Sequence, residues 1–203
     1  GANVPIADFS DVYKTGVSVE AGLFYSLPLI GLDLTLTAGY NGFKFKNEYF
    51  TDLVRSNLEV EVRDFAPDWT ATDIPVMIGA RFKLPVSSIK PYVTGEIGIH
   101  VMNFNERFNG SKIIGSSSDP SSFSLSGATE SKSKIGFGFA FGAGVEIPII
   151  PKVSIDLGAK YNYNGITYSN SFEVFRNSNS NFINPELKNA SYLSFRGGVV
   201  LDF

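Results

Sequence analysis

The 203-residue sequence has no cysteine, only one histidine and only one tryptophan. Without cysteine it can form no disulfide, no thiolate metal site and no thiol nucleophile. No apolar run approaches the roughly 18 residues that a membrane-spanning helix needs. The formal net charge of -3 provides no basic surface, so we expect no nucleic-acid partner. These absences leave a soluble protein or a β-barrel.

Composition favours the barrel. Glycine occurs 20 times, phenylalanine 18 times and tyrosine 9 times, at a mean hydropathy of only +0.06. This much glycine disfavours a helical protein, and the aromatic residues suit a sheet with aromatic girdles. The length fits one domain, so we expect a single barrel over residues 1–203.

Seven segments alternate apolar and polar residues with a period of two, the pattern of β-strands. They cover 17–27, 32–45, 74–84, 90–104, 135–147, 153–163 and 192–203. Within 32–45 the apolar residues change from even to odd positions, because Phe43 and Phe45 follow Tyr40. We expect a bulge or the membrane boundary near Asn41 and Gly42 to explain that change.

The connections between these segments alternate in length. Short turns containing proline lie near 28–31, 85–89 and 148–151, and long polar loops cover about 46–73, 105–133 and 165–190. Short turns at one end and long loops at the other are typical of outer-membrane barrels. Segments of this length also match a tilted strand that crosses a bilayer.

The last segment alternates up to the final residue, Phe203. Together with the strand pattern, this end resembles the small outer-membrane β-barrel family that includes the OmpA transmembrane domain and OmpX. The resemblance implies a Gram-negative outer membrane, with extracellular loops and periplasmic termini. It also implies two partners: outer-membrane lipid, and the outer-membrane assembly machinery, which reads the terminal aromatic residue as its signal.

Single-chain bacterial barrels have an even number of strands, so seven segments require an eighth. Only residues 1–7 remain for it, followed by Asp8–Gly16 as the shortest external loop. We therefore predict an all-β, eight-stranded, antiparallel up-and-down transmembrane barrel whose first strand is short or has lost its leading residues.

The polar face of the strands is small and charged, which suits a narrow lumen better than an outer surface. We expect its ionisable residues to form a lumenal charge network that leaves no wide pore. These residues are Glu20, Asp33, Arg81, Lys83, Glu96, His100, Glu146, Asp156, Lys160 and Arg196. The alternative is a soluble barrel with the apolar face inside. Interfacial aromatic belts are expected at Tyr25, Tyr40, Phe104, Tyr161 and Tyr163.

His100 is the one candidate for a catalytic residue. With a serine and a carboxylate it could form a hydrolase triad, as in barrel lipid-A deacylases. Those enzymes work on the lipid-facing surface, and no serine near His100 has a nucleophile context. We expect His100 to pair with Glu96 as part of the structure, and we expect no catalytic residue, no metal site and no cofactor. Acidic pairs such as Asp8 with Asp11 are ordinary solvated charges.

The loops carry more apolar residues than solvated loops need, which indicates a protein partner or contact between loops. The candidates for such contacts are Phe50, Phe65, Trp69, Phe172 and Phe175. The sequence thus predicts a structural or surface-interaction role through the loops. Three alternatives stay open: a small porin, a subunit of a larger secretion or surface-layer complex, and a lipid-modifying enzyme.

Overall fold

The computed structural model describes residues 1–28, 31–48, 52, 68–84, 89–107, 112–114, 122–126, 130–169, 172–176, 179–183 and 186–202. At Asp68 and within 106–130 and 168–188, this description covers the backbone but not the side chains. In these ranges no helix has both the length and the apolar character needed to cross a membrane.

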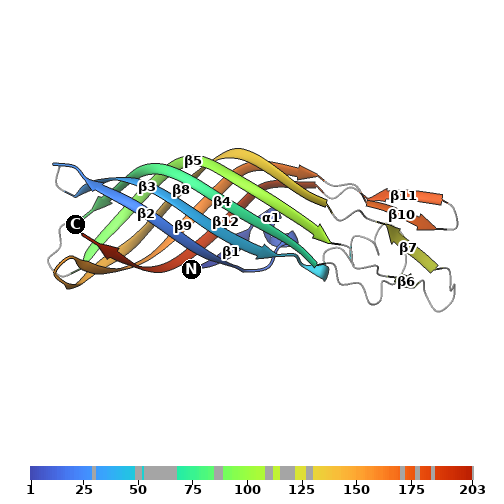
Figure 1. Ribbon diagram of the computed structural model, residues 1–203, viewed down its shortest axis with the longest axis horizontal. Coiled ribbons are helices and arrows are strands. Elements are labelled where there is room, and N and C mark those ends of the chain that lie inside the picture. Colours follow the sequence, from blue (N-terminus) through green and yellow to red (C-terminus); the bar gives the residue numbers. More distant parts are fainter. Residues whose placement is uncertain are drawn as a thin grey trace.

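Eight antiparallel strands close into a barrel in the order β1, β12, β9, β8, β5, β4, β3, β2 (Figure 1). They are β1 Ala2–Ile6, β2 Gly16–Ser26, β3 Leu32–Lys44, β4 Asp68–Lys83, β5 Lys90–Arg107, β8 Glu130–Ile150, β9 Val153–Ser169 and β12 Glu186–Leu201. The eight-stranded up-and-down barrel predicted from the sequence is confirmed. Its first strand is short, with five residues.

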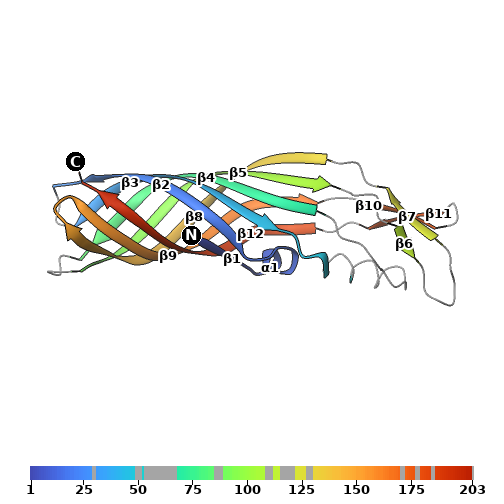
Figure 2. The same ribbon diagram turned by 60° about the horizontal axis from the view of Figure 1, so that its bottom comes forward.

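Four more strands form a separate sheet, here named the distal sheet, in the order β11, β10, β7, β6. Their bounds are β6 Lys112–Ile114, β7 Ser122–Ser126, β10 Phe172–Arg176 and β11 Asn179–Ile183. Figures 1 and 2 place this sheet beyond the barrel end that carries the long connections. The expected loop bounds were therefore wrong, because barrel strands extend into all three loops and two loops contain strands of their own.

Apolar side chains cover the outside of the barrel. Phe137 is 82% exposed and Val19 is 75% exposed, whereas the inward-facing Thr37 is only 3% exposed. The outer surface therefore carries the apolar face, and the soluble barrel with an apolar interior is wrong. Tyr25 and Tyr40 are exposed on this surface, as expected for interfacial residues.

The expected bulge near Asn41 is absent from β3. Its register is constant against both neighbours, from Val17↔Gly42 to Ser26↔Asp33 with β2 and from Leu32↔Phe82 to Lys44↔Thr70 with β4. Phe43 and Phe45 are buried at odd positions, on the same inward face as Asp33. The apolar residues therefore move to odd positions because the inward face of β3 becomes apolar there. The alternation of inward and outward residues along the strand does not change. Phe104 is also buried, so its assignment to an outer belt was wrong.

A short helix, α1 Asp8–Val12, occupies the connection expected as a simple loop between β1 and β2. Phe9 on this helix has no exposed surface. After the helix, the chain pairs with the end of β3 through two hydrogen bonds: Lys14 N–H donates to Lys44 O and Lys46 N–H donates to Val12 O, both at 2.8 Å. These bonds hold α1 against the barrel end.

Candidate functional site

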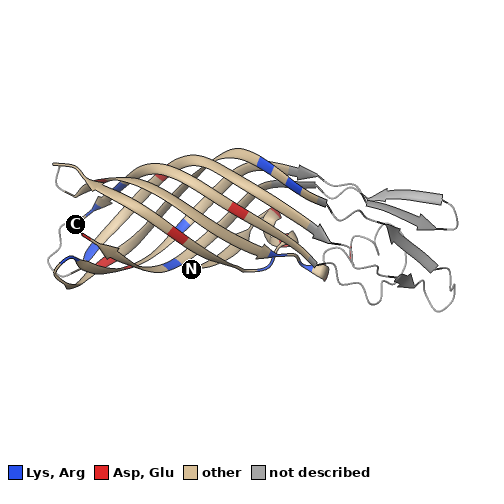
Figure 3. Ribbon diagram, viewed as in Figure 1, with Lys and Arg blue, Asp and Glu red and all other residues tan. Residues whose placement is uncertain are grey.

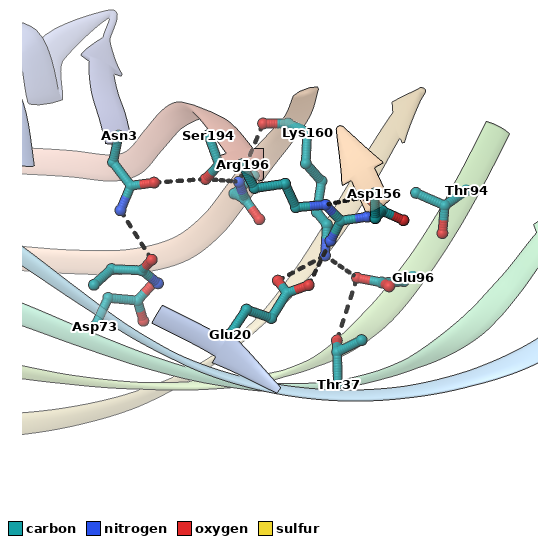
Figure 4. Close-up of polar contacts among 12 residues, drawn as sticks. Asn3, Glu20, Thr37, Asp73, Thr94, Glu96, Asp156, Lys160, Ser194 and Arg196 are labelled. Carbon is teal, nitrogen blue, oxygen red and sulfur yellow. Dashed lines mark hydrogen bonds and ion pairs between the residues drawn. The ribbon is translucent and has the colours of Figure 1, made fainter. Parts of the chain in front are cut away.

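The lower lumen, toward the short turns, holds a continuous set of ion pairs that we name the lumenal ion network. Nine of the ten predicted lumenal residues belong to it, in the order Asp33, Lys83, Glu146, Arg81, Asp156, Arg196, Glu20, Lys160 and Glu96. Figure 4 shows Glu20, Glu96, Lys160 and Arg196 pointing toward one another from different strands. Lys90, which the sequence reasoning missed, adds a contact of 3.5 Å to Glu146. Lys90 and Tyr92 both lie at even positions of β5. This shared parity was the signal in the sequence that could have identified Lys90 as a lumenal residue.

Asp156 on β9 is the centre of this network. It accepts hydrogen bonds from Arg81 at 3.0 Å and from the Tyr92 hydroxyl at 2.7 Å. The Arg81 guanidinium lies between two rings, 4.2 Å from the centroid of Phe24 and 4.0 Å from that of Tyr92. Stacking on both faces adds cation–π attraction to the ion pair and fixes the guanidinium plane.

Charges of both signs alternate through the network. Figure 3 shows acidic and basic positions intermixed along the barrel strands. With Lys90 included, the network holds five acidic and five basic side chains, so the charges balance. A buried carboxylate or ammonium is tolerated only with partners of this kind, because desolvation of a lone charge costs several kcal/mol.

Above the network, a row of side chains crosses the lumen, here named the lumenal hydrogen-bond chain. Asn162 donates to Ser194 at 2.9 Å, Ser194 to Asn3 at 2.7 Å, and Asn3 to Asn41 at 2.9 Å. Asn41 donates to the Tyr192 hydroxyl at 3.0 Å, and that hydroxyl donates to Asp73 at 2.7 Å. The chain joins β9, β12, β1, β3 and β4, so it ties the short first strand to the opposite wall.

His100 completes this chain, with its Nδ1 3.0 Å from both carboxylate oxygens of Asp73. The expected pairing with Glu96 was wrong, because Glu96 binds Lys160 at 2.8 Å. Glu96 and His100 are four residues apart on one strand, which corresponds to about 13 Å and is beyond contact. Asp73 is diagonal to His100 across β4 and β5, since its ladder partner is Met102.

An aromatic group, here named the mouth cluster, closes the upper lumen beneath the long connections. Its members are Phe9, Tyr13, Phe43, Phe45, Trp69 and Tyr192. The ring centroids of Phe45 and Trp69 are 4.5 Å apart, and those of Phe9 and Phe43 are 4.9 Å apart. All six side chains are buried. Rings from α1, β3, β4 and β12 therefore meet across the barrel.

The mouth cluster changes the assignment of one predicted loop residue. Trp69 lies within β4 and is buried, so its role as a loop contact was wrong. Trp69 lies at an odd position, on the same inward face as Ala71 and Asp73. The strand predicted from the sequence began only at Ile74, so it did not include these residues. Phe172 and Phe175 lie in β10, where only the backbone is described. Phe50, Phe65 and Phe203 lie outside the described residues.

Among the described residues, no serine is placed against His100 as a hydrolytic site would require. The ring is fully buried, and its Nε2 has no hydrogen-bond partner among the described residues. A serine nucleophile would have to lie at that nitrogen and reach a substrate. The mouth cluster lies above the ring and the lumenal ion network lies below it. The arrangement instead cross-links opposite walls of the barrel.

Two solved structures share this architecture. Neisserial surface protein A aligns with a TM-score of 0.51 and 15% identity, covering 100% of this chain and 93% of that protein. A major outer membrane protein from Thermus thermophilus aligns with a TM-score of 0.53 and 10% identity, covering 98% and 95%. At these identities the likeness concerns the fold alone. Among curated proteins, none matches this sequence.

Family membership follows from the sequence match. The family model described as "Outer membrane protein beta-barrel domain" matches residues 1–195. This span includes nearly all of the lumenal ion network, and all of the lumenal hydrogen-bond chain and the mouth cluster. The chain belongs to the outer membrane protein β-barrel domain family.

Proposed function

We propose that this outer-membrane barrel is a non-enzymatic surface protein that recognises a partner through the distal sheet. In this proposal the long connections are extracellular and the termini are periplasmic. Outer-membrane lipid covers the apolar outer face of the barrel. The outer-membrane assembly machinery inserts the barrel into the membrane. The barrel serves as a rigid, closed support for the recognition surface.

The pairing of β7 with β10 is the observation that carries this proposal. Residues 124–126 pair with 173–175, although they come from two different long connections. A connection that served only to join two barrel strands could be a few residues long. Two long connections that build one four-stranded sheet form a defined surface, and binding residues commonly lie on loops that a rigid scaffold supports.

The filled lumen disfavours the porin alternative. A conducting barrel needs a continuous aqueous channel, and eight strands leave an interior just wide enough for side chains. Here the mouth cluster occupies the upper lumen and the lumenal ion network occupies much of the lower lumen. Arg81, Glu146 and Lys160 are each at most 3% exposed.

Orientation can be tested cleanly because the sequence contains no cysteine. We expect Ser180→Cys, on β11, to react with a membrane-impermeant maleimide on intact cells. Lys152→Cys, in the short turn between β8 and β9, should react only after the outer membrane is permeabilised. The reverse labelling pattern would contradict the proposed orientation.

The recognition role needs a variant that keeps the barrel. Replacing 108–129 and 170–185 by short Gly-Ser linkers removes the distal sheet and leaves the eight barrel strands. Proteins cross-linked to the wild type in native membranes should be lost from this variant, while its heat-modifiable migration on SDS gels is retained. An identical set of cross-linked proteins in both samples, or none in either, would contradict recognition through this sheet.

A further inference from the structure

The two faces of the distal sheet differ in composition. Residues that are directly paired across antiparallel strands lie on the same face, so the register assigns each residue of this sheet to one face. The opposite face mixes serines with Lys112, Glu173, Phe175 and Phe182. The first face, here named the distal apolar face, holds Ile113, Phe123, Leu125, Phe172, Val174 and Ile183.

The residues of the distal apolar face are neighbours across all four strands. Three pairs connect them: Phe172↔Ile183 between β10 and β11, Val174↔Leu125 between β10 and β7, and Ile113↔Phe123 between β6 and β7. The polar residues of the same face lie along β11 and its turn with β10; they are Arg176, Asn179 and Asn181. A small sheet with a continuous apolar face is stable in water only when another surface covers that face.

The orientation of the sheet limits which partner can reach this face. Figures 1 and 2 show β10 and β11 running roughly along the long axis of the barrel, beyond its end. A sheet whose strands follow this axis has faces that are directed sideways, parallel to the plane of the membrane. The distal apolar face is therefore directed toward molecules that stand beside the barrel in the same membrane.

The size of the face limits the partner further. At about 3.4 Å per residue and about 4.8 Å between strands, the distal apolar face covers about 300 Å². Stable complexes between freely diffusing proteins bury about 800 Å² on each partner. A partner confined to the same membrane has a much higher effective concentration, so a smaller contact is sufficient. Area and orientation both favour a partner that is anchored beside the barrel.

We propose that the distal apolar face docks against the same face of a second copy of this chain in the same membrane. This inference rests on the proposed recognition role of the distal sheet and names its partner. A two-fold axis along the membrane normal relates the copies and brings the two faces together at the same height. Two apolar sheet faces can then pack about 10 Å apart. Arg176 lies beside the β10–β11 turn, where water and salt screen its charge.

Phe172 and Phe175 provide a matched pair of positions for the test. Both belong to β10 and both are phenylalanine, but the register places them on opposite faces of the sheet. The photoreactive residue p-benzoylphenylalanine replaces either one with a similar ring. Two differently tagged copies of the full chain are produced together and irradiated in native membranes. Heat-modifiable migration on SDS gels verifies that each variant keeps the barrel.

We expect the probe at 172 to give a product of twice the mass of the chain that carries both tags, and the probe at 175 to give none. A second substitution, Val174→Asp, should abolish this product because it places a charge in the middle of the distal apolar face. Phe175→Asp, on the opposite face, should leave it unchanged. Loss of the product in both or in neither would overturn the docking of this face.

The other outcomes separate this inference from the proposed function. A product that joins 172 to a different protein would overturn the pairing of two copies and leave recognition through the distal sheet intact. A cross-link from 172 only to other residues of its own chain would overturn the pairing, because the chain would then cover this face itself. Equal dimer products from 172 and 175 would indicate random collision and overturn the pairing. No product from either position would contradict both proposals.

Discussion

Asp156 is the residue on which the lumenal ion network depends most, because donors from three strands converge on its carboxylate. Arg81, Tyr92 and Arg196 all contact it, and its own surface is almost fully buried. Removing its charge leaves two guanidinium groups facing each other without the anion between them. The cost is therefore larger than the loss of one surface ion pair.

We expect Asp156→Asn to lower the free energy of unfolding by about 3 kcal/mol. Asp202→Asn is the matched control, since Asp202 is exposed beyond the end of β12 and should change stability by less than about 0.5 kcal/mol. Urea unfolding in lipid vesicles measures both, with the single tryptophan, Trp69, as the fluorescent probe. Equal losses for the two variants would contradict the central role of Asp156.

Tyr192 links the lumenal hydrogen-bond chain to the mouth cluster. Its hydroxyl accepts from Asn41 and donates to Asp73, and its ring centroid lies 5.2 Å from that of Phe43. We expect Tyr192→Phe to cost about 1–3 kcal/mol, because Asp73 and Asn41 lose a buried partner. Tyr40→Phe, on the exposed outer face, should cost less than about 0.5 kcal/mol in the same unfolding experiment. An unchanged free energy of unfolding in Tyr192→Phe would show that Asp73 and Asn41 find other partners.

At the scale of elements, α1 contributes to the lumen although it lies in a connection. Five residues are too few to hold an isolated helix, so its position depends on packing and on the hydrogen bonds to the end of β3. Phe9 is its one fully buried side chain and enters the mouth cluster.

We expect Phe9→Ala to cost about 3–5 kcal/mol, because the truncation leaves a cavity among packed rings. It should also shift Trp69 emission to longer wavelength as water enters the cluster. Asp11→Ala, on the exposed face of the same helix, is the control and should change neither property. Unchanged emission in Phe9→Ala would mean that α1 does not seal the mouth.

The strands were predictable as elements but their ends were not. Alternation marks a strand only where one face is apolar, and the upper parts of β4 and β5 carry apolar residues on the inward face instead. Trp69, Ala71 and Phe104 therefore looked like loop or belt residues in the sequence. The constant register of β3 against both neighbours shows that the phase never changed.

At the scale of the whole molecule, the lumen is divided into three levels. The mouth cluster, the lumenal hydrogen-bond chain and the lumenal ion network follow one another from the long connections toward the short turns. Each level joins opposite walls, so the barrel should behave as one cooperative unit rather than as a flexible sheet.

This filling predicts that the barrel does not conduct. In planar lipid bilayers we expect no stepwise current from the wild type, while a large porin prepared in the same way provides the positive control. Defined, voltage-stable steps would contradict the packed lumen and would revive the porin alternative.

The sequence by itself determined the barrel, its outward apolar face and most members of the lumenal ion network, because these properties follow from a local period of two and from loop lengths. Only the tertiary structure decided which side chains meet. Asp73 with His100, Asn3 with Asn41, and Trp69 with Phe45 are pairs set by strand tilt and register around a closed ring. These pairs come from separate strands, and a local periodicity carries no information about which of them face each other.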